Sequence, residues 1–106
     1  MQKWSDYIGA SVKQSRQFLV FGKVQGVGFR RFVKAKVDAI NEEEMKISGY
    51  VCNLSDGSVR VVAQGSKEDL QKLYEILSVG TIKSEVSHIE VSDVAKAEFD
   101  SFEILR

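Results

Sequence analysis

The sequence has few of the residues that build covalent or metal-dependent sites. It contains one cysteine, Cys52, and one histidine, His88. A single cysteine excludes a disulfide within the chain, and a single histidine removes most sets of metal ligands. We therefore expect no metal ion and no cofactor, and a reducing compartment suits this composition.

The chain also lacks a net charge and a long apolar run. Its 15 basic and 15 acidic side chains cancel, so the overall field gives no general attraction to nucleic acid or to an anionic membrane. No apolar run could span a bilayer, and residues 1–15 contain no signal-peptide core. We expect a cytoplasmic monomer with neither nucleic-acid nor membrane partners.

With 106 residues the chain has the length of one domain. We expect residues 1–15 to form a flexible N-terminal extension and residues 16–106 to form the domain. Residues 1–40 carry eight basic and two acidic side chains. This local excess fits solvated helix faces, and it also fits mild steering of an anionic substrate.

Residues 18–30, F-L-V-F-G-K-V-Q-G-V-G-F-R, predict a strand, a glycine-containing loop and the first turn of a helix. Such a loop directs unpaired N–H groups and the positive end of the helix dipole at one small volume, which suits a phosphate. Arg30 lies in the first helical turn, where its guanidinium could close over the anion, whereas Arg31 should point toward solvent. The phosphate-loop and dinucleotide motifs are both absent, so nucleotide binding is not expected.

The remaining periodicity predicts the order β-α-β-β-α-β followed by a short strand. We expect strands over residues 16–23, 45–53, 58–64, 86–94 and 102–105, and helices over residues 29–40 and 67–79. Ser66 should cap the second helix and Gly80 should end it, while residues 41–44 should form a solvated turn. This order favours an α+β, ferredoxin-like (βαββαβ) sandwich, with two helices on one face of a mostly antiparallel sheet.

The helical spacing also predicts which side chains face the core. The first helix should bury one stripe: Phe29, Phe32, Val33, Val37 and Ile40. The second should bury another: Leu70, Leu73, Tyr74 and Leu77.

Asn53 lies at the end of the second predicted strand, just before the turn Ser55-Asp56-Gly57. It could be a turn residue whose amide bonds to the backbone, or its amide could hold a water molecule. Cys52 alternates with Asn53 and so points to the opposite face of the strand. We therefore do not expect Cys52 and His88 to act as a nucleophile and its base.

Two stretches resemble the signatures of the acylphosphatase family. Residues 22–30, G-K-V-Q-G-V-G-F-R, match G-x-V-Q-G-V-x-F-R without a mismatch. Residues 48–60 are similar to G-[WY]-V-x-N-x-x-D-G-x-V-E and differ at the last place, Arg60. The closing F-E-I-L also fits the family, and the resemblance covers residues 16–106.

The resemblance implies hydrolysis of acyl phosphates to a carboxylate and inorganic phosphate, without a metal ion or a phosphoenzyme. It implies that Arg30 and Asn53 are the catalytic residues, with Asn53 orienting the attacking water. The phosphoryl group would be bound by Arg30 and by the backbone N–H groups of the loop: Gln25, Gly26, Val27, Gly28, Phe29 and Arg30.

Two alternatives keep the fold and change the function. The first is a non-catalytic binding module for RNA or a small anion, although residues 58–64 lack the aromatic side chains that RNA recognition would use. The second is a domain that handles carbamoyl phosphate within a larger enzyme. Residues 38–46 depart from the family's usual short approach to the second strand and could alter the distance between Arg30 and Asn53.

Overall fold

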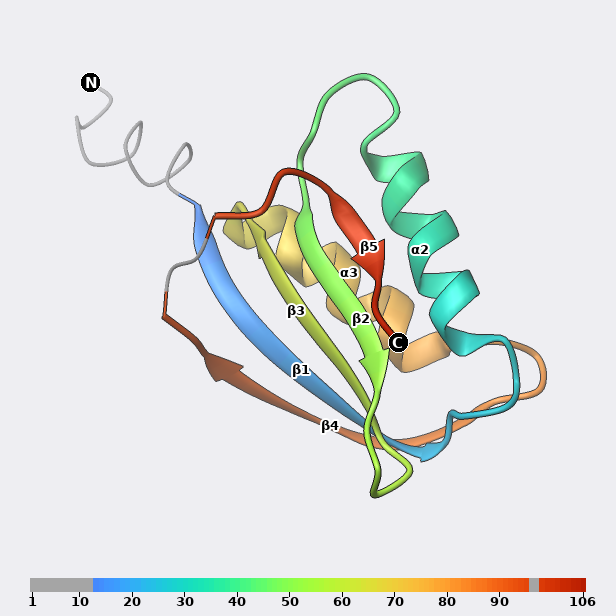
Figure 1. Cartoon of the computed structure of the whole chain (residues 1–106). Coiled ribbons are helices and arrows are strands. Elements are labelled where there is room, and N and C mark those ends of the chain that lie inside the picture. The colour runs from blue at the N-terminus through green and yellow to red at the C-terminus, as the bar shows by residue number, and fades with distance from the viewer. Residues whose placement is uncertain (1–12, 96–97) are drawn as a thin grey trace, which may run out of the picture.

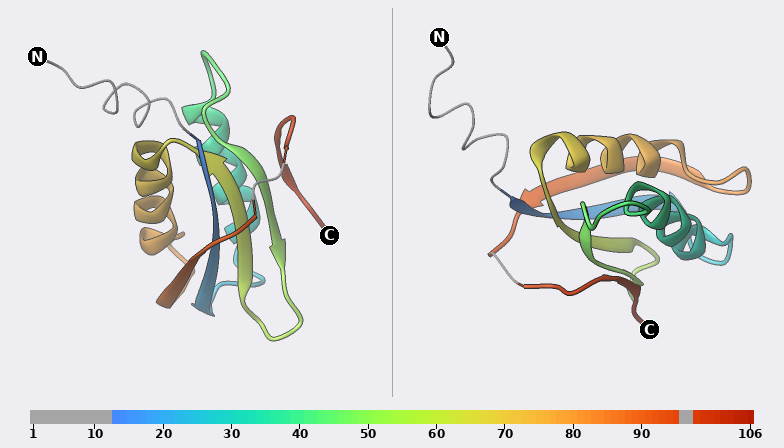
Figure 2. Two further views of the ribbon diagram at one scale, coloured as in Figure 1. Left: turned by 90° about the vertical axis from the view of Figure 1, so that its left-hand side faces the viewer. Right: turned by 90° about the horizontal axis from the view of Figure 1, so that it is seen from above.

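The computed structural model describes residues 13–95 and 98–106, which form a single sheet with two helices on one face (Figures 1 and 2). The strands are β1 (Gln14–Lys23), β2 (Ser48–Asn53), β3 (Val59–Gly65), β4 (Glu85–Asp93) and β5 (Phe102–Ile104), and the helices are α2 (Phe29–Ile40) and α3 (Lys67–Val79). The predicted order of elements and the α+β, ferredoxin-like fold are confirmed.

In the sheet, whose strand order is β4-β1-β3-β2-β5, three strands have their carboxyl ends at the same end of the sheet. Strand β3 is antiparallel to both β1 and β2, so β1 and β2 run in the same direction. Strand β5 is parallel to β2 and pairs with its outer side. The chain therefore leaves β1, β2 and β5 at the same end, where α2 also begins.

The first strand starts earlier than predicted. Strand β1 begins at Gln14 and pairs with β3 as far as Gly65. Ser15 is buried there, opposite Gln64, because the antiparallel ladder continues past the apolar run that marked the strand in the sequence. Residues 1–12 of the predicted extension lie outside the described residues.

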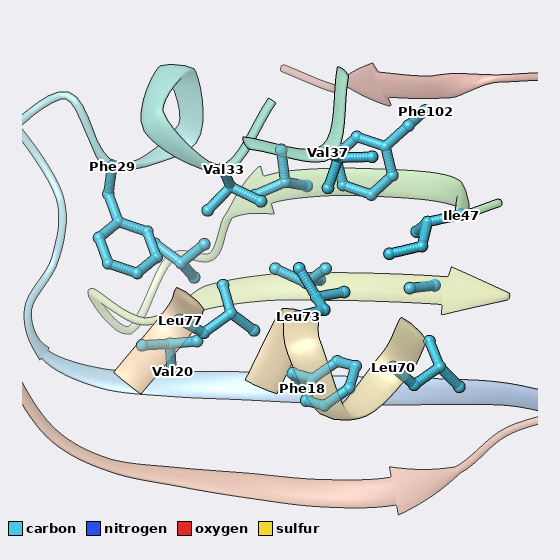
Figure 3. Close-up of a cluster of buried hydrophobic side chains, with 14 of the residues drawn as sticks. Phe18, Val20, Phe29, Val33, Val37, Ile47, Leu70, Leu73, Leu77 and Phe102 are labelled. Atoms are coloured by element: carbon cyan, nitrogen blue, oxygen red, sulfur yellow. The ribbon is translucent and has the colours of Figure 1, made fainter. Parts of the chain in front are cut away.

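The core lies between the sheet and the two helices (Figure 3). Three residues of α2 (Phe29, Val33, Val37) and three of α3 (Leu70, Leu73, Leu77) are buried against Phe18 and Val20 of β1, among others. Fully burying one such side chain contributes roughly 1.5–3 kcal/mol. The first predicted stripe is confirmed, with Phe32 and Ile40 partly buried at its borders.

The prediction that Tyr74 is buried was wrong. Its side chain is 36% exposed, although it lies one residue from the buried Leu73. Position 74 is at the border of the stripe set by Leu70, Leu73 and Leu77, and the phenolic hydroxyl keeps access to water there.

Helix α3 carries both predicted end signals. The Ser66 hydroxyl accepts a hydrogen bond from the Asp69 N–H at 3.1 Å, and Gly80 ends the helix with a φ of 68°. The Asp69 carboxylate accepts from the Ser66 hydroxyl at 2.9 Å rather than from its backbone N–H. A side chain next to α3 in the sequence thus provides the hydrogen-bond acceptor that an N–H group in the first turn of the helix needs.

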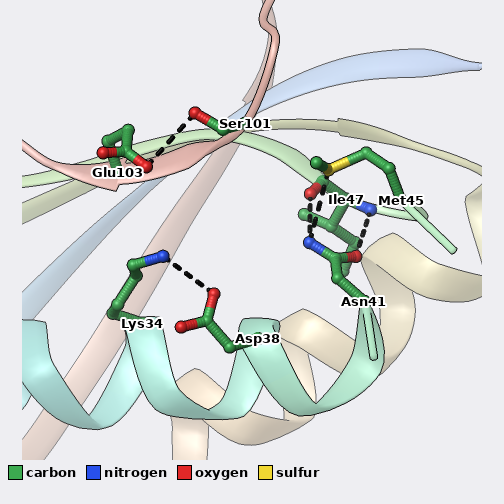
Figure 4. Close-up of polar contacts among 7 residues, drawn as sticks. All are labelled: Lys34, Asp38, Asn41, Met45, Ile47, Ser101 and Glu103. Atoms are coloured by element: carbon green, nitrogen blue, oxygen red, sulfur yellow. Dashed lines mark hydrogen bonds and ion pairs between the residues drawn. The ribbon is translucent and has the colours of Figure 1, made fainter. Parts of the chain in front are cut away.

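The connection from α2 to β2 is held by Asn41 (Figure 4). The side-chain oxygen Oδ1 of Asn41 accepts from the N–H groups of Lys46 and Ile47, both at 2.9 Å, and its side-chain Nδ2 donates to the Ile47 carbonyl oxygen at 2.8 Å. Strand β2 therefore starts at Ser48, three residues later than predicted, because Lys46 and Ile47 bond to this side chain. Residues 42–46 are exposed, as the predicted solvated turn requires.

Candidate active site

The loop between β1 and α2 takes a shape that only glycine adopts without strain at two positions. Gly26 and Gly28 have φ angles of 74° and 76°, in the left-handed region. A Cβ atom at either position would meet nothing within 4 Å, so the constraint is conformational and not one of space. Gly28 is also the N-cap of α2 and provides no side-chain hydrogen bond to the helix.

This loop is anchored on several sides. The side chains of Val24 and Phe29, at its two ends, are buried in the core. The Thr81 hydroxyl donates to the Val27 carbonyl oxygen at 3.4 Å and so connects the loop to the segment after α3. The loop is held in place by packing before any ligand binds.

The N–H groups from Gln25 to Arg31 donate no hydrogen bond to any acceptor among the described residues. A helix leaves its first N–H groups without partners within the helix, and the Phe32 N–H is the first in α2 to find one, in the Gly28 carbonyl at 3.0 Å. These free donors and the helix dipole suit an anion.

Gln25 connects the loop to the β2–β3 hairpin. Its side-chain nitrogen donates to the carbonyl oxygens of Leu54 at 2.7 Å and Ser58 at 2.8 Å. These two residues close the hairpin turn, since the Leu54 N–H donates to the Ser58 carbonyl at 2.9 Å. The side chain of Gln25 thus fixes the loop against the turn that follows Asn53.

A pocket of about 270 Å³ lies at this end of the sheet, and both predicted catalytic residues line it. Arg30 comes from the first turn of α2, and Asn53 is the last residue of β2. Gly26, Gly28 and Phe29 also line the pocket, whereas Gln25 and Val27 do not. The structure therefore brings the arginine, the amide and most of the loop to one cavity.

The pocket contains residues that the sequence did not indicate. Arg31 was predicted to point away; it is exposed, yet it lines the pocket together with Val24, Ile104 and Arg106. Residues 104 and 106 reach the site because β5 pairs in parallel with β2. In the sequence, the only indication that Arg106 could reach the site was its position directly after the last short strand.

The turn after Asn53 is stabilised by Asp56. The Asp56 carboxylate accepts hydrogen bonds from the hydroxyl and the N–H of Ser58. The hydroxyl bond, followed by the N–H bond, lowers the pKa of the Asp56 carboxyl below its usual value. The charged form of Asp56 thus supports the hairpin that carries Asn53.

Cys52 and His88 are not brought together. Cys52 is half-buried on β2, and His88 is on β4, with β3 and β1 between them; two intervening strands separate them by roughly 14 Å. His88 instead stacks on the Phe21 ring at 4.5 Å. Among residues 13–95 and 98–106, no three His, Cys, Asp or Glu side chains gather where they could ligate one metal ion.

Residues 38–46 lie away from the pocket. The pocket is at the start of α2, whereas residues 38–46 are the last residues of α2 and the connection that follows it (Figure 1). The 12 residues of α2 span about 18 Å. The departure from the family pattern is therefore outside the site.

No helix among the described residues is long and apolar enough to cross a membrane.

The fold and the pocket define a class, that of ferredoxin-like domains with an arginine-lined loop site at the carboxyl ends of their parallel strands. The sequence model of the acylphosphatase family matches residues 16–104. An acylphosphatase from Helicobacter hepaticus is 59% identical over 96 residues, which are 90% of this chain and 100% of that protein. The chain belongs to the acylphosphatase family, and its activity is the hydrolysis of acyl phosphates.

Solved structures agree with this assignment. The crystal structure of acylphosphatase from Bacillus subtilis superposes with a TM-score of 0.78 at 33% identity, covering 90% of this chain and 100% of that one. The structure of full-length HypF in a phosphate- and nucleotide-bound form also gives 0.78, at 28% identity, with 91% of this chain matching 12% of that one. The binding-module and carbamoyl-phosphate alternatives are not favoured by these comparisons.

Proposed function

We propose that this enzyme hydrolyses acyl phosphates with its loop amides, Arg30 and Asn53, and without a metal ion or cofactor. The observation that carries the proposal is that Arg30, Asn53 and the glycines of the loop line the same pocket. The pocket supplies donors for an anion and a neutral amide beside them. Among the residues that line it, none is a histidine, a cysteine, an aspartate or a glutamate.

In the proposed mechanism, the phosphoryl oxygens accept hydrogen bonds from the loop N–H groups from Gln25 to Arg30 and from the Arg30 guanidinium. Asn53 orients a water molecule toward phosphorus. A bond forms between the water oxygen and phosphorus, and the bond from phosphorus to the carboxyl oxygen breaks, releasing a carboxylate. A phosphoryl oxygen takes the proton from the attacking water.

The chemistry requires little more than this. A carboxylate is a good leaving group, and phosphoryl transfer through a loose transition state depends mostly on positioning and on stabilising negative charge. Donors fixed by packing before binding need no reorganisation during the reaction. The buried side chains of Val24 and Phe29 give the loop this rigidity.

The test is hydrolysis of benzoyl phosphate by the purified enzyme after dialysis against EDTA. We expect full activity, with release of one phosphate and one benzoate for each substrate consumed. Activity that is lost with EDTA and restored by a divalent ion would overturn the metal-free mechanism. We further propose that the protein is a cytoplasmic monomer without nucleic-acid partners. Light scattering tests the monomeric state, and an RNA-binding assay tests the absence of nucleic-acid partners.

A further inference from the structure

The pocket contains more guanidinium groups than the proposed phosphoryl site uses. Three arginines line it, Arg30, Arg31 and Arg106, and no aspartate or glutamate does. Within residues 13–95 and 98–106, none of the three guanidinium groups has a carboxylate within 4.0 Å. An acyl phosphate carries a charge near −2 at neutral pH, by analogy with other phosphate esters. Binding of the phosphoryl group is assigned to Arg30 and the loop, so the guanidinium groups of Arg31 and Arg106 are left for another part of the substrate.

Arg106 reaches the pocket from the segment that follows β5. The parallel register pairs Val51 with Ile104, and the Leu105 N–H donates to the Val51 carbonyl at 2.9 Å. Continuing this register by two residues brings Arg106 level with Asn53. Arg106 thus lies beside the proposed water-orienting amide.

Arg31 is the second cation outside the phosphoryl cradle. It follows Arg30 on α2, about 100° further round the helix, and is exposed, as Arg106 is. Both side chains therefore line the pocket from its rim, whereas Arg30 is half-buried. The two rim arginines are available to a part of the substrate that extends beyond the phosphoryl group.

The apolar residues that line the pocket could contact the carbon atoms of an acyl group. Val24 and Phe29 are buried and Ile104 packs against the core, so that these three line the pocket with apolar surface. At about 270 Å³, the pocket is below the usual range for drug-sized ligands and fits a small substrate.

We propose that Arg31 and Arg106 form a second anion subsite, and that the enzyme prefers small acyl phosphates whose acyl group carries its own anionic group. This inference rests on the proposed function, because the loop and Arg30 must hold the phosphoryl end. The second anion, a carboxylate or a phosphate, would accept charge-assisted hydrogen bonds from these two guanidinium groups.

The test compares 4-carboxybenzoyl phosphate with 4-carbamoylbenzoyl phosphate, which has almost the same shape but no charge on the ring substituent; the 3-substituted pair covers a shorter reach. We expect kcat/KM to be about tenfold higher for the carboxylate. Each exposed arginine should contribute about threefold. Arg31→Gln and Arg106→Gln should each lower the preference about threefold, and the double variant should bring it close to one.

Lys67→Gln is the matched control, because it removes one positive charge at the start of α3, outside the pocket. It should leave the preference unchanged. A preference that falls equally in this variant would assign the effect to net charge and overturn the subsite. A wild-type ratio near one, with benzoyl phosphate still hydrolysed, would overturn the subsite and leave the proposed function standing.

Binding measured without turnover separates the two proposals further. The dissociation constants of 4-carboxybenzylphosphonate and its carbamoyl analogue can be compared by calorimetry in the same variants. A charge preference that depends on Arg31 and Arg106 supports the subsite even if hydrolysis fails, in which case only the proposed function is overturned. Equal affinity for the two phosphonates contradicts the subsite.

Discussion

The side-chain nitrogen of Gln25 lies 2.7 Å from the carbonyl oxygen of Leu54, the residue directly after Asn53. This bond and the second bond from Gln25, to Ser58, join the loop proposed to bind the phosphoryl group to the turn that follows β2. The distance between the two halves of the proposed site therefore depends on one amide group.

Gln25→Ala removes this connection and leaves two carbonyl oxygens without their donor. We expect kcat for benzoyl phosphate to fall about tenfold and the free energy of unfolding to fall by about 1–3 kcal/mol. If Gln25 acts by positioning Asn53, the same substitution in an Asn53→Ala background should change kcat much less. Equal effects in both backgrounds would leave Gln25 with a purely structural role.

Arg30→Gln removes the guanidinium that is proposed to close over the phosphoryl group. We expect KM to rise and kcat to fall, with kcat/KM lower by about 10²–10³, since the charge contacts both ground state and transition state. Lys34→Gln, one turn further along α2, is the control; Lys34 pairs with Asp38 at 2.8 Å, away from the pocket (Figure 4). Steady-state kinetics of the two variants tests the assignment, which equal losses would contradict.

Asn53→Ala removes the amide proposed to orient the water. We expect kcat to fall by about 10² with little change in KM, because the amide acts on the attacking water and not on bound substrate. Cys52→Ala is the neighbouring control on the opposite face of β2 and should retain activity. A large rise in KM with unchanged kcat would instead make Asn53 a substrate-binding residue.

Asn41→Ala should lower stability without lowering kcat. It deletes two hydrogen bonds to Ile47 (Figure 4) and one to the Lys46 N–H, at a cost of about 2–3 kcal/mol. Thermal unfolding and benzoyl phosphate kinetics measure the two effects. A fall in kcat at temperatures where the variant is fully folded would mean that this end of α2 influences the pocket.

The Asp56 carboxyl has a lowered pKa in the folded protein, so it contributes stability above the pKa of the unfolded chain, about 4. This contribution is lost as the pH falls through the folded pKa. We expect Asp56→Asn to be less stable than the wild type at pH 7 and equally stable at the lowest pH where both still fold. Chemical denaturation across this range tests it, and a difference independent of pH would contradict it.

Residues that are neighbours in the sequence were enough to predict the loop and the ends of both helices. The glycines at positions 26 and 28, placed between a β-prone run and a helical stripe, indicated the loop and the start of α2 at Phe29. Ser66 and Gly80 marked the ends of α3 because capping depends on residues that are neighbours in sequence. Arg30 and Asn53 were predicted as a pair from the resemblance, and they line one pocket.

Long-range contacts could not be read in the same way. Gln25 reaches Leu54 across 29 residues, and nothing in either stretch indicates that partner. Arg106 enters the pocket through the parallel pairing of β5 with β2, which depends on the whole sheet. Arg31 was assigned to solvent from helical geometry, which gives a side chain's direction but not the shape of the surface around it.

The two helices differ in how their first turns are completed. The N-cap of α3 is Ser66, whose hydroxyl accepts a hydrogen bond from the helix, whereas the N-cap of α2 is Gly28, which has no side chain. In the proposed complex the phosphoryl group takes the place of that missing cap. Each catalytic cycle would then close and reopen a helix end, so inorganic phosphate should act both as a product inhibitor and as a thermal stabiliser of the enzyme.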